Sequence, residues 1–233
     1  MVAGPNLTWN LPPPAGFQPF RDDLPVTWYE QELPHLRQDG ATYFVTFRLN
    51  DSLPQSKLAE LRLFRSEWSL KNPKPRSQAI IDSYTQEVMR RVENWLDQQM
   101  GTCVLERGEI AAKIVAAMLR GDQEDHELGC FVVMPNHVHA VVRPLKPAAL
   151  PLEIILRNWK GKSAREINEM LGSSGTVWRR ESFDRVIRDA EHLYRVIQYT
   201  GRNPRKARLA PDRYQLWIRP SWVEQGWNYE LTA

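Results

Sequence analysis

The chain has 233 residues, which is enough for one hydrophobic core with an appended lobe. Its apolar content of 42% and charged content of 25% are those of a soluble globular protein, and no apolar stretch approaches the roughly 18 residues that a membrane span needs. Two cysteines exclude a disulfide framework, and the N-terminus lacks the basic start and apolar core of a signal peptide, so we expect a cytoplasmic protein.

The first forty residues are predicted to form an irregular arm, because repeated prolines exclude a regular helix there. A strand is predicted at 42–49, where β-branched and aromatic residues end in a polar turn. Apolar residues then recur at helical spacing at 53–70 and at 78–99. Residues 53–100 are therefore expected to form a helical hairpin inserted between sheet elements.

The remaining predicted elements are an extended piece at 103–105, a helix at 109–120, a strand pair at 128–134 and 138–142, a second helix at 150–171, an edge strand at 183–187 and a last helix at 189–202. The last helix is expected to stop at Asn203-Pro204, since a residue before proline disfavours the helical conformation. This order predicts a ferredoxin-like or RRM-like α+β fold, an antiparallel sheet with helices packed on it. We expect one domain at 41–209, preceded by the arm at 1–40 and followed by a tail at 210–233.

Two histidines stand one residue apart in the predicted strand pair, at His137 and His139. Alternate side chains of a strand point to the same face, so the two imidazoles should lie side by side while Val138 enters the core. Two neutral imidazoles at this spacing supply half of a metal site. Two partly buried histidines with ordinary hydrogen bonds are the alternative interpretation.

A second pair of reactive groups lies on the last predicted helix, at Tyr199 and Asn203. Residues four apart share one helix face. A tyrosine can act as a covalent nucleophile, and an asparagine oxygen can bind a metal. If that face docks beside His137 and His139, one site holds two imidazoles, an amide and a tyrosine. Each residue taken singly fits a purely structural role as well.

Three motifs, in this order, resemble those of one family. The run Phe131 to Val142, FVVMPNHVHAVV, is similar to the His-hydrophobe-His (HUH) motif of single-tyrosine transposases. The run Trp178 to Asp189 and the helix from Tyr199 to Ala207 resemble segments of the REP-associated tyrosine transposases. The resemblance extends from about Tyr43 to Leu209, so the domain at 41–209 would be the catalytic domain of such a protein.

The resemblance implies roles for four residues. His137, His139 and Asn203 would bind a divalent metal, and Tyr199 would be the nucleophile. The reaction implied is cleavage of single-stranded DNA through a 5′-phosphotyrosine intermediate, followed by rejoining. The resemblance implies Mg²⁺ or Mn²⁺ as the metal, whereas two imidazole ligands considered without the resemblance suit Mn²⁺ or Zn²⁺ better.

The implied partner is single-stranded DNA folded as a hairpin, of the REP-like palindromic kind, in a bacterial cytoplasm and at the nucleoid when bound. Positive charge crowds the stretch from Arg157 to Arg219, which suits a phosphate-rich partner, although a solvated basic surface fits charge alone equally well. The expected phosphate contacts are Lys160, Lys162, Arg165, Arg205 and Lys206. Both a monomer and a homodimer are compatible with the sequence.

Three other functions remain open. A non-catalytic RRM-like nucleic-acid-binding protein derived from such a transposase would bind hairpins without forming a covalent adduct. A metal-dependent hydrolase of small molecules would not need Tyr199. A purely structural α+β protein would bind no divalent metal.

Overall fold

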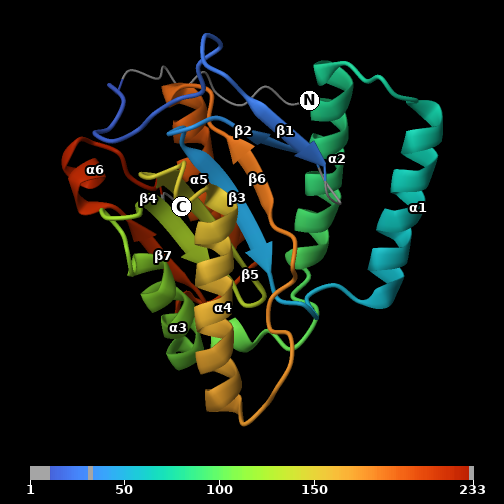
Figure 1. Ribbon diagram of the computed structural model, residues 1–233. Helices are drawn as coiled ribbons and strands as arrows, with labels where there is room; N and C mark the ends of the chain where they lie inside the picture. Colours follow the sequence, from blue (N-terminus) through green and yellow to red (C-terminus); the bar gives the residue numbers. More distant parts are fainter. Residues whose placement is uncertain (1–10, 31–33, 231–233) are drawn as a thin grey trace.

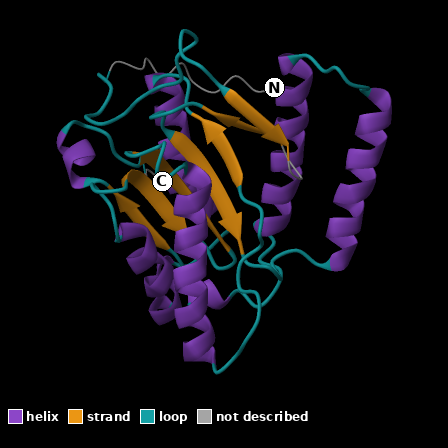
Figure 2. Ribbon diagram, in the orientation of Figure 1, coloured by secondary structure: helices purple, strands orange, loops and turns teal. Residues whose placement is uncertain are grey.

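The computed structural model describes residues 11–30 and 34–230, and its central element is a five-stranded antiparallel sheet (Figures 1 and 2). The strand order is β6-β3-β5-β4-β7. These strands are β3 (Tyr43–Arg48), β4 (His126–Val133), β5 (His137–Pro144), β6 (Phe183–Val186) and β7 (Gln215–Ile218). Without β7, the order by position in the chain is fourth, first, third, second, so the predicted ferredoxin-like α+β architecture is confirmed.

Helices cover both faces of this sheet (Figure 1). α3 (Gly108–Leu119) and α4 (Leu152–Leu171) pack on one face, in a core shared with Val45, Val138 and other sheet residues. α5 (Ala190–Lys206) and the short α6 (Pro220–Glu224) contribute to a second core on the opposite face. Because strand side chains alternate, β5 supplies valines and an alanine to the first core and its two histidines to the α5 side.

A helical hairpin precedes α3 in the chain. It consists of α1 (Gln55–Lys71) and α2 (Gln78–Leu96), and α1 is the outermost helix in Figure 1. No residue of α1 is fully buried, whereas α2 buries Tyr84, Val88 and Val92 among its apolar neighbours. The fully buried residues of this hairpin therefore lie on α2.

Three local expectations were wrong. The arm is not wholly irregular, because β1 (Thr27–Glu30) and β2 (Pro34–Arg37) pair in an antiparallel hairpin beside β6; a proline at the first position of a strand does not interrupt the ladder. Residues 103–105 are not extended, since a 3₁₀ turn spans Val104–Glu106. The last helix does not stop at Asn203, since α5 runs through Pro204 to Lys206.

The continuation of α5 has a physical reason. A proline removes one backbone hydrogen bond from a helix, but here Asn203 and Pro204 are buried and the packing of the last turn outweighs that loss. The backbone N–H of Ala207 still donates to the Asn203 carbonyl at 3.0 Å. Asn203 consequently lies within the helix rather than at its frayed end.

The predicted tail contributes to the fold. A 3₁₀ turn at Pro211–Arg213 leads into β7, which pairs with β4, and Trp222 and Trp227 are buried in the core on the α5 side. Among the described helices, none combines the length and apolar character that crossing a bilayer would require. The parts of the predicted arm at 1–10 and 31–33, and of the predicted tail at 231–233, lie outside the described residues.

Candidate active site

His137 and His139 project from β5 toward α5, on the same face of the sheet, as their spacing predicted. Both are buried, with 1% and 0% of their surface exposed. Their Nε2 atoms are 3.1 Å apart. Val138 between them enters the core on the other face.

The second nitrogen of each ring is held by a neighbouring side chain. His137 Nδ1 lies 2.8 Å from Asn136 Oδ1, and His139 Nδ1 lies 2.7 Å from Thr46 Oγ1. The Asn136 amide nitrogen donates to the backbone carbonyls of Leu96, the last residue of α2, and of Met100 beyond it, so its oxygen faces His137 as an acceptor. His137 therefore carries its proton on Nδ1 and turns an Nε2 lone pair into the site.

His139 Nε2 faces the same point, 3.1 Å from His137 Nε2 and 3.2 Å from the Asn203 amide nitrogen. Because the Thr46 hydroxyl can donate to or accept from Nδ1, the proton of this ring can lie on either nitrogen. With the proton on Nε2 the two rings share a hydrogen bond, and with the proton on Nδ1 both Nε2 lone pairs are available to a cation. Burial lowers the pKa of His137 to about 3 and the pKa of His139 well below 6.5, so neither ring carries a charge at neutral pH.

α5 brings Tyr199 and Asn203 to the histidines on the helix face that their spacing predicted. The Tyr199 ring packs edge-on against His139 at 5.4 Å and against Phe44 at 5.9 Å. The Tyr199 hydroxyl and Asn203 Oδ1 are buried without a hydrogen bond of normal geometry to any described residue. Polar atoms left in this way are costly, which is typical of a site built for a ligand.

Glu93 of α2 is a further member of the site, and the sequence alone did not predict this residue. Burial, followed by the negative charge of Glu93, raises the pKa of Tyr199 above its ordinary value, and burial raises the pKa of Glu93. An ion pair of 2.7 Å between Asp97 and Lys206 fastens α2 to α5 at the same place. No motif marks Glu93, because its carboxylate reaches Tyr199 only through the packing of two helices distant in sequence.

The three expected ligands fit a divalent metal in part. Within the described residues no cluster of three or more His, Cys, Asp or Glu side chains is placed to hold a metal, so the donor set is two imidazoles and one amide. Two adjacent ligands about 2.1 Å from an octahedral ion are roughly 3.0 Å apart, which matches the 3.1 Å between the Nε2 atoms. Turning the Asn203 amide over would place its unpartnered oxygen beside His139.

The expected phosphate contacts do not form one surface. Lys160, Lys162 and Arg165 lie on α4, whereas Arg205 and Lys206 lie on α5, across the sheet. Lys206 is paired with Asp97. Lys160, expected to contact phosphate, instead points toward the segment that follows α4. It is half-buried, burial lowers its pKa to about 8, and its ammonium donates to two carbonyls and a hydroxyl.

The fold and site define an α+β protein with a histidine pair, an amide and a tyrosine at the sheet–helix interface. No protein-family model matches the chain, and no curated protein matches it. Among solved structures, it is similar to a REP-associated tyrosine transposase bound to a REP hairpin, at a TM-score of 0.39 and 16% identity. That similarity covers 76% of this chain and 72% of the other chain.

Proposed function

We propose that this protein is a metal-dependent tyrosine transposase or strand transferase that cleaves and rejoins single-stranded, hairpin-forming DNA. The observation that carries the proposal is the convergence of His137 Nε2 and His139 Nε2, 3.1 Å apart, beside the buried Tyr199 hydroxyl. The order of motifs in the sequence supports the same assignment.

The proposed chemistry is one transesterification and its reverse. The Tyr199 oxygen attacks a backbone phosphorus, a 5′-phosphotyrosine bond forms, and the bond to the preceding 3′-oxygen breaks. Glu93 lies beside the hydroxyl and can accept its proton, and the leaving 3′-oxygen takes up a proton to become a hydroxyl. Attack by another 3′-hydroxyl on the phosphotyrosine rejoins a strand without ATP.

Mg²⁺ or Mn²⁺ is the proposed cofactor, held by His137, His139 and Asn203. When bound, such an ion polarises a phosphoryl oxygen and stabilises the charge that develops on it. The chain's own contribution is positioning. Thr46 and Asn136 hold the two rings in one orientation, and the Phe44 ring stacks on His139 with centroids 5.4 Å apart, so both nitrogens stay aimed at one point.

The test is an assay for a covalent protein–DNA adduct on a denaturing gel, with hairpin DNA carrying a single-stranded flank and Mg²⁺ or Mn²⁺ present. The wild-type protein should form the adduct and Tyr199→Phe should not. Tyr194→Phe is the matched control, because Tyr194 lies on the same helix but its hydroxyl bonds Glu230 of the tail. Hairpin binding by the wild-type protein without any adduct would instead favour the non-catalytic nucleic-acid-binding protein.

A further inference from the structure

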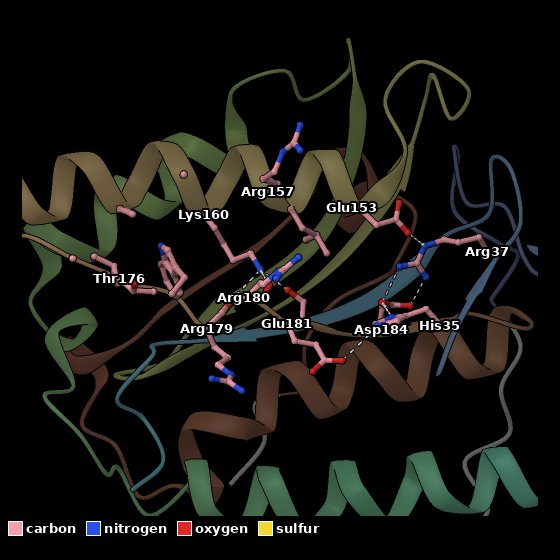
Figure 3. Close-up of a pocket in the computed structure, with 17 residues that line it drawn as sticks. His35, Arg37, Glu153, Arg157, Lys160, Thr176, Arg179, Arg180, Glu181 and Asp184 are labelled. Carbon is pink, nitrogen blue, oxygen red and sulfur yellow. Dashed lines mark hydrogen bonds and ion pairs between the residues drawn. The ribbon is translucent and has the colours of Figure 1, made fainter. Parts of the chain in front are cut away.

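A cavity of about 400 Å³ opens on the α4 side of the sheet, separate from the histidine site (Figure 3). α4 forms one wall, the segment 175–184 forms the other, and His35 and Arg37 of β2 lie at one end. The volume lies within the range of small-molecule sites, roughly 300 to 1,000 Å³. None of the residues assigned to the chemistry lines it, so the cavity requires its own explanation.

The walls of this cavity are fixed by hydrogen bonds rather than left to a mobile loop. Lys160 Nζ donates to the carbonyls of Arg179 and Arg180, at 3.3 and 2.6 Å, and to Ser182 Oγ at 2.9 Å. Trp178 Nε1 donates to Ser163 Oγ of α4 at 2.9 Å. The segment is thus fastened to α4 at two places, and the cavity is formed before any ligand enters it.

The charge of the lining favours an anion. The carboxylates of Glu153 and Asp184 both pair with Arg37, and Asp184 also pairs with His35 at 2.6 Å. The exposed guanidinium of Arg180 forms no ion pair with another described residue, and in Figure 3 it lies between the two walls. A phosphate group at this place would meet an available arginine, in a lining where five Lys and Arg side chains outnumber the three carboxylates of Glu153, Glu181 and Asp184.

Part of the lining is apolar, and it includes a glycine that the fold does not require. Leu156, Ala164 and Val177 line the cavity beside Gly161 in the middle of α4. A Cβ atom added to Gly161 would meet no other atom within 4 Å. Because glycine within a helix is less stable than alanine, an occupant lying against the helix backbone explains the missing side chain.

We propose that this cavity binds one unpaired nucleotide of a DNA strand, with the base against Gly161 and the apolar side chains and the phosphate at Arg180. The inference rests on the proposed function in that it takes the partner to be a single strand. A base has a flat, largely apolar face, and its backbone supplies the anion. A paired and stacked base cannot enter such a cavity without leaving the duplex, so the site distinguishes single-stranded from double-stranded DNA.

The test compares binding of a fluorescein-labelled oligothymidylate with binding of the same strand fully paired to oligoadenylate, by fluorescence anisotropy. Gly161→Leu fills the cavity and should weaken single-strand binding about tenfold while leaving duplex binding unchanged. Asn158→Leu adds the same side chain to an exposed position of α4 outside the lining and should stay within about twofold of the wild type. Equal single-strand affinity of Gly161→Leu and wild type would overturn the proposal.

A second variant covers the case in which Gly161→Leu does not fold, as judged by circular dichroism. Arg180→Ala changes an exposed side chain and should weaken single-strand binding several-fold with an unchanged unfolding midpoint; unchanged binding would contradict the proposal. Thymidine monophosphate should compete only weakly. If it competes as well as the oligonucleotide does, the cavity is a site for free nucleotides and the strand assignment is wrong.

These outcomes separate the cavity from the catalytic proposal, because binding is measured without metal and without reaction. If the wild-type protein forms no covalent adduct but Gly161→Leu still loses single-strand affinity, the proposed chemistry fails and the cavity assignment stands. If the adduct forms and Gly161→Leu binds the single strand normally, the cavity assignment alone is overturned.

Discussion

The histidine pair depends on the residues that orient its rings. Thr46 lies opposite His139 on the neighbouring strand β3, and its hydroxyl fixes the ring through Nδ1 at 2.7 Å. Such outer partners of metal ligands keep the ring in one tautomer and in one orientation. A metal site built on His139 should therefore respond to Thr46, although Thr46 would not touch the metal.

Replacing Thr46 by Val should weaken Mn²⁺ binding by roughly 10- to 100-fold, because the shape is kept and only the hydrogen bond is lost. His139→Ala should abolish detectable binding and adduct formation. Isothermal titration with Mn²⁺ measures the first effect and the denaturing gel the second. Normal Mn²⁺ affinity and normal cleavage by His139→Ala would show that this residue is no ligand.

His35 makes a second residue-scale prediction, which concerns stability and pH. Burial acts to lower the pKa of His35, but the hydrogen bond to Asp184 and the Glu181 carboxylate 3.7 Å away outweigh it and raise the pKa from 6.5 to about 9. The folded chain consequently holds this proton more tightly than the unfolded chain. The stability that the proton supplies is complete below pH 6.5 and is lost as the pH rises through about 9.

His35→Gln should therefore destabilise the protein more at low pH than at high pH. The difference in unfolding free energy between wild type and variant should be roughly 1 to 3 kcal/mol larger below pH 6.5, the pKa of His35 in the unfolded chain, than above about pH 9, its pKa in the folded chain. Urea unfolding at the two pH values measures this. A gap that stays constant or widens as the pH rises is the contrary result.

At the scale of elements, the helical hairpin contributes a carboxylate to the site through α2. Glu93→Gln should slow adduct formation by about 100-fold, the lower end of the range for general base catalysis, with little change in hairpin affinity. Glu87→Gln is the matched control on the same helix, where Glu87 pairs with Arg90 and Arg91 at the surface. Single-turnover kinetics give the rates, and equal rates for wild type and Glu93→Gln would remove Glu93 from the mechanism.

Elements with a clear periodic pattern could be predicted from the sequence, and those decided by distant contacts could not. The β3 and β5 strands follow from β-branched residues and alternation, and the shared face of Tyr199 and Asn203 follows from helical spacing. The end of α5 was misplaced because packing of its last turn outweighs the local effect of Pro204.

The short hairpin β1–β2 was missed for a different reason. Each strand has four residues, too few for alternation to be recognised, and the surrounding prolines pointed to irregular structure. Its contribution, the pairing of His35 and Arg37 with Asp184, joins segments about 150 residues apart. Glu93 and the internal bonds of Lys160 likewise depend on contacts that no local pattern encodes.

At the scale of the whole molecule, the sheet separates two surfaces. The α5 side holds the histidines and Tyr199, and the α4 side holds the cavity with Lys162 and Arg165. A DNA hairpin with a single-stranded flank would have to contact both sides of one protein chain, or one side of each of two chains. The basic residues on the two sides are therefore expected to contribute separately to DNA affinity.

Hairpin affinity should fall steeply with salt, with a linear dependence of log K on log salt concentration. Lys162→Ala, Arg165→Ala and Arg205→Ala should each reduce the slope by roughly one, whereas Arg62→Ala on the outer helix α1 should not change it. Anisotropy titrations at several salt concentrations supply the slopes. A flat plot for the wild-type protein would rule out phosphate contacts as the main source of affinity.

The central claim is that Tyr199 becomes linked to DNA, and the most direct measurement is the mass of the DNA-linked peptide. Trypsin should release Tyr194 in the peptide 189–195 and Tyr199 in the peptide 196–202, so the two tyrosines separate cleanly. After reaction with hairpin DNA and nuclease trimming, we expect the added nucleotide mass on the peptide 196–202 alone. The same mass on the peptide 189–195, or an adduct that persists in Tyr199→Phe, would contradict the account.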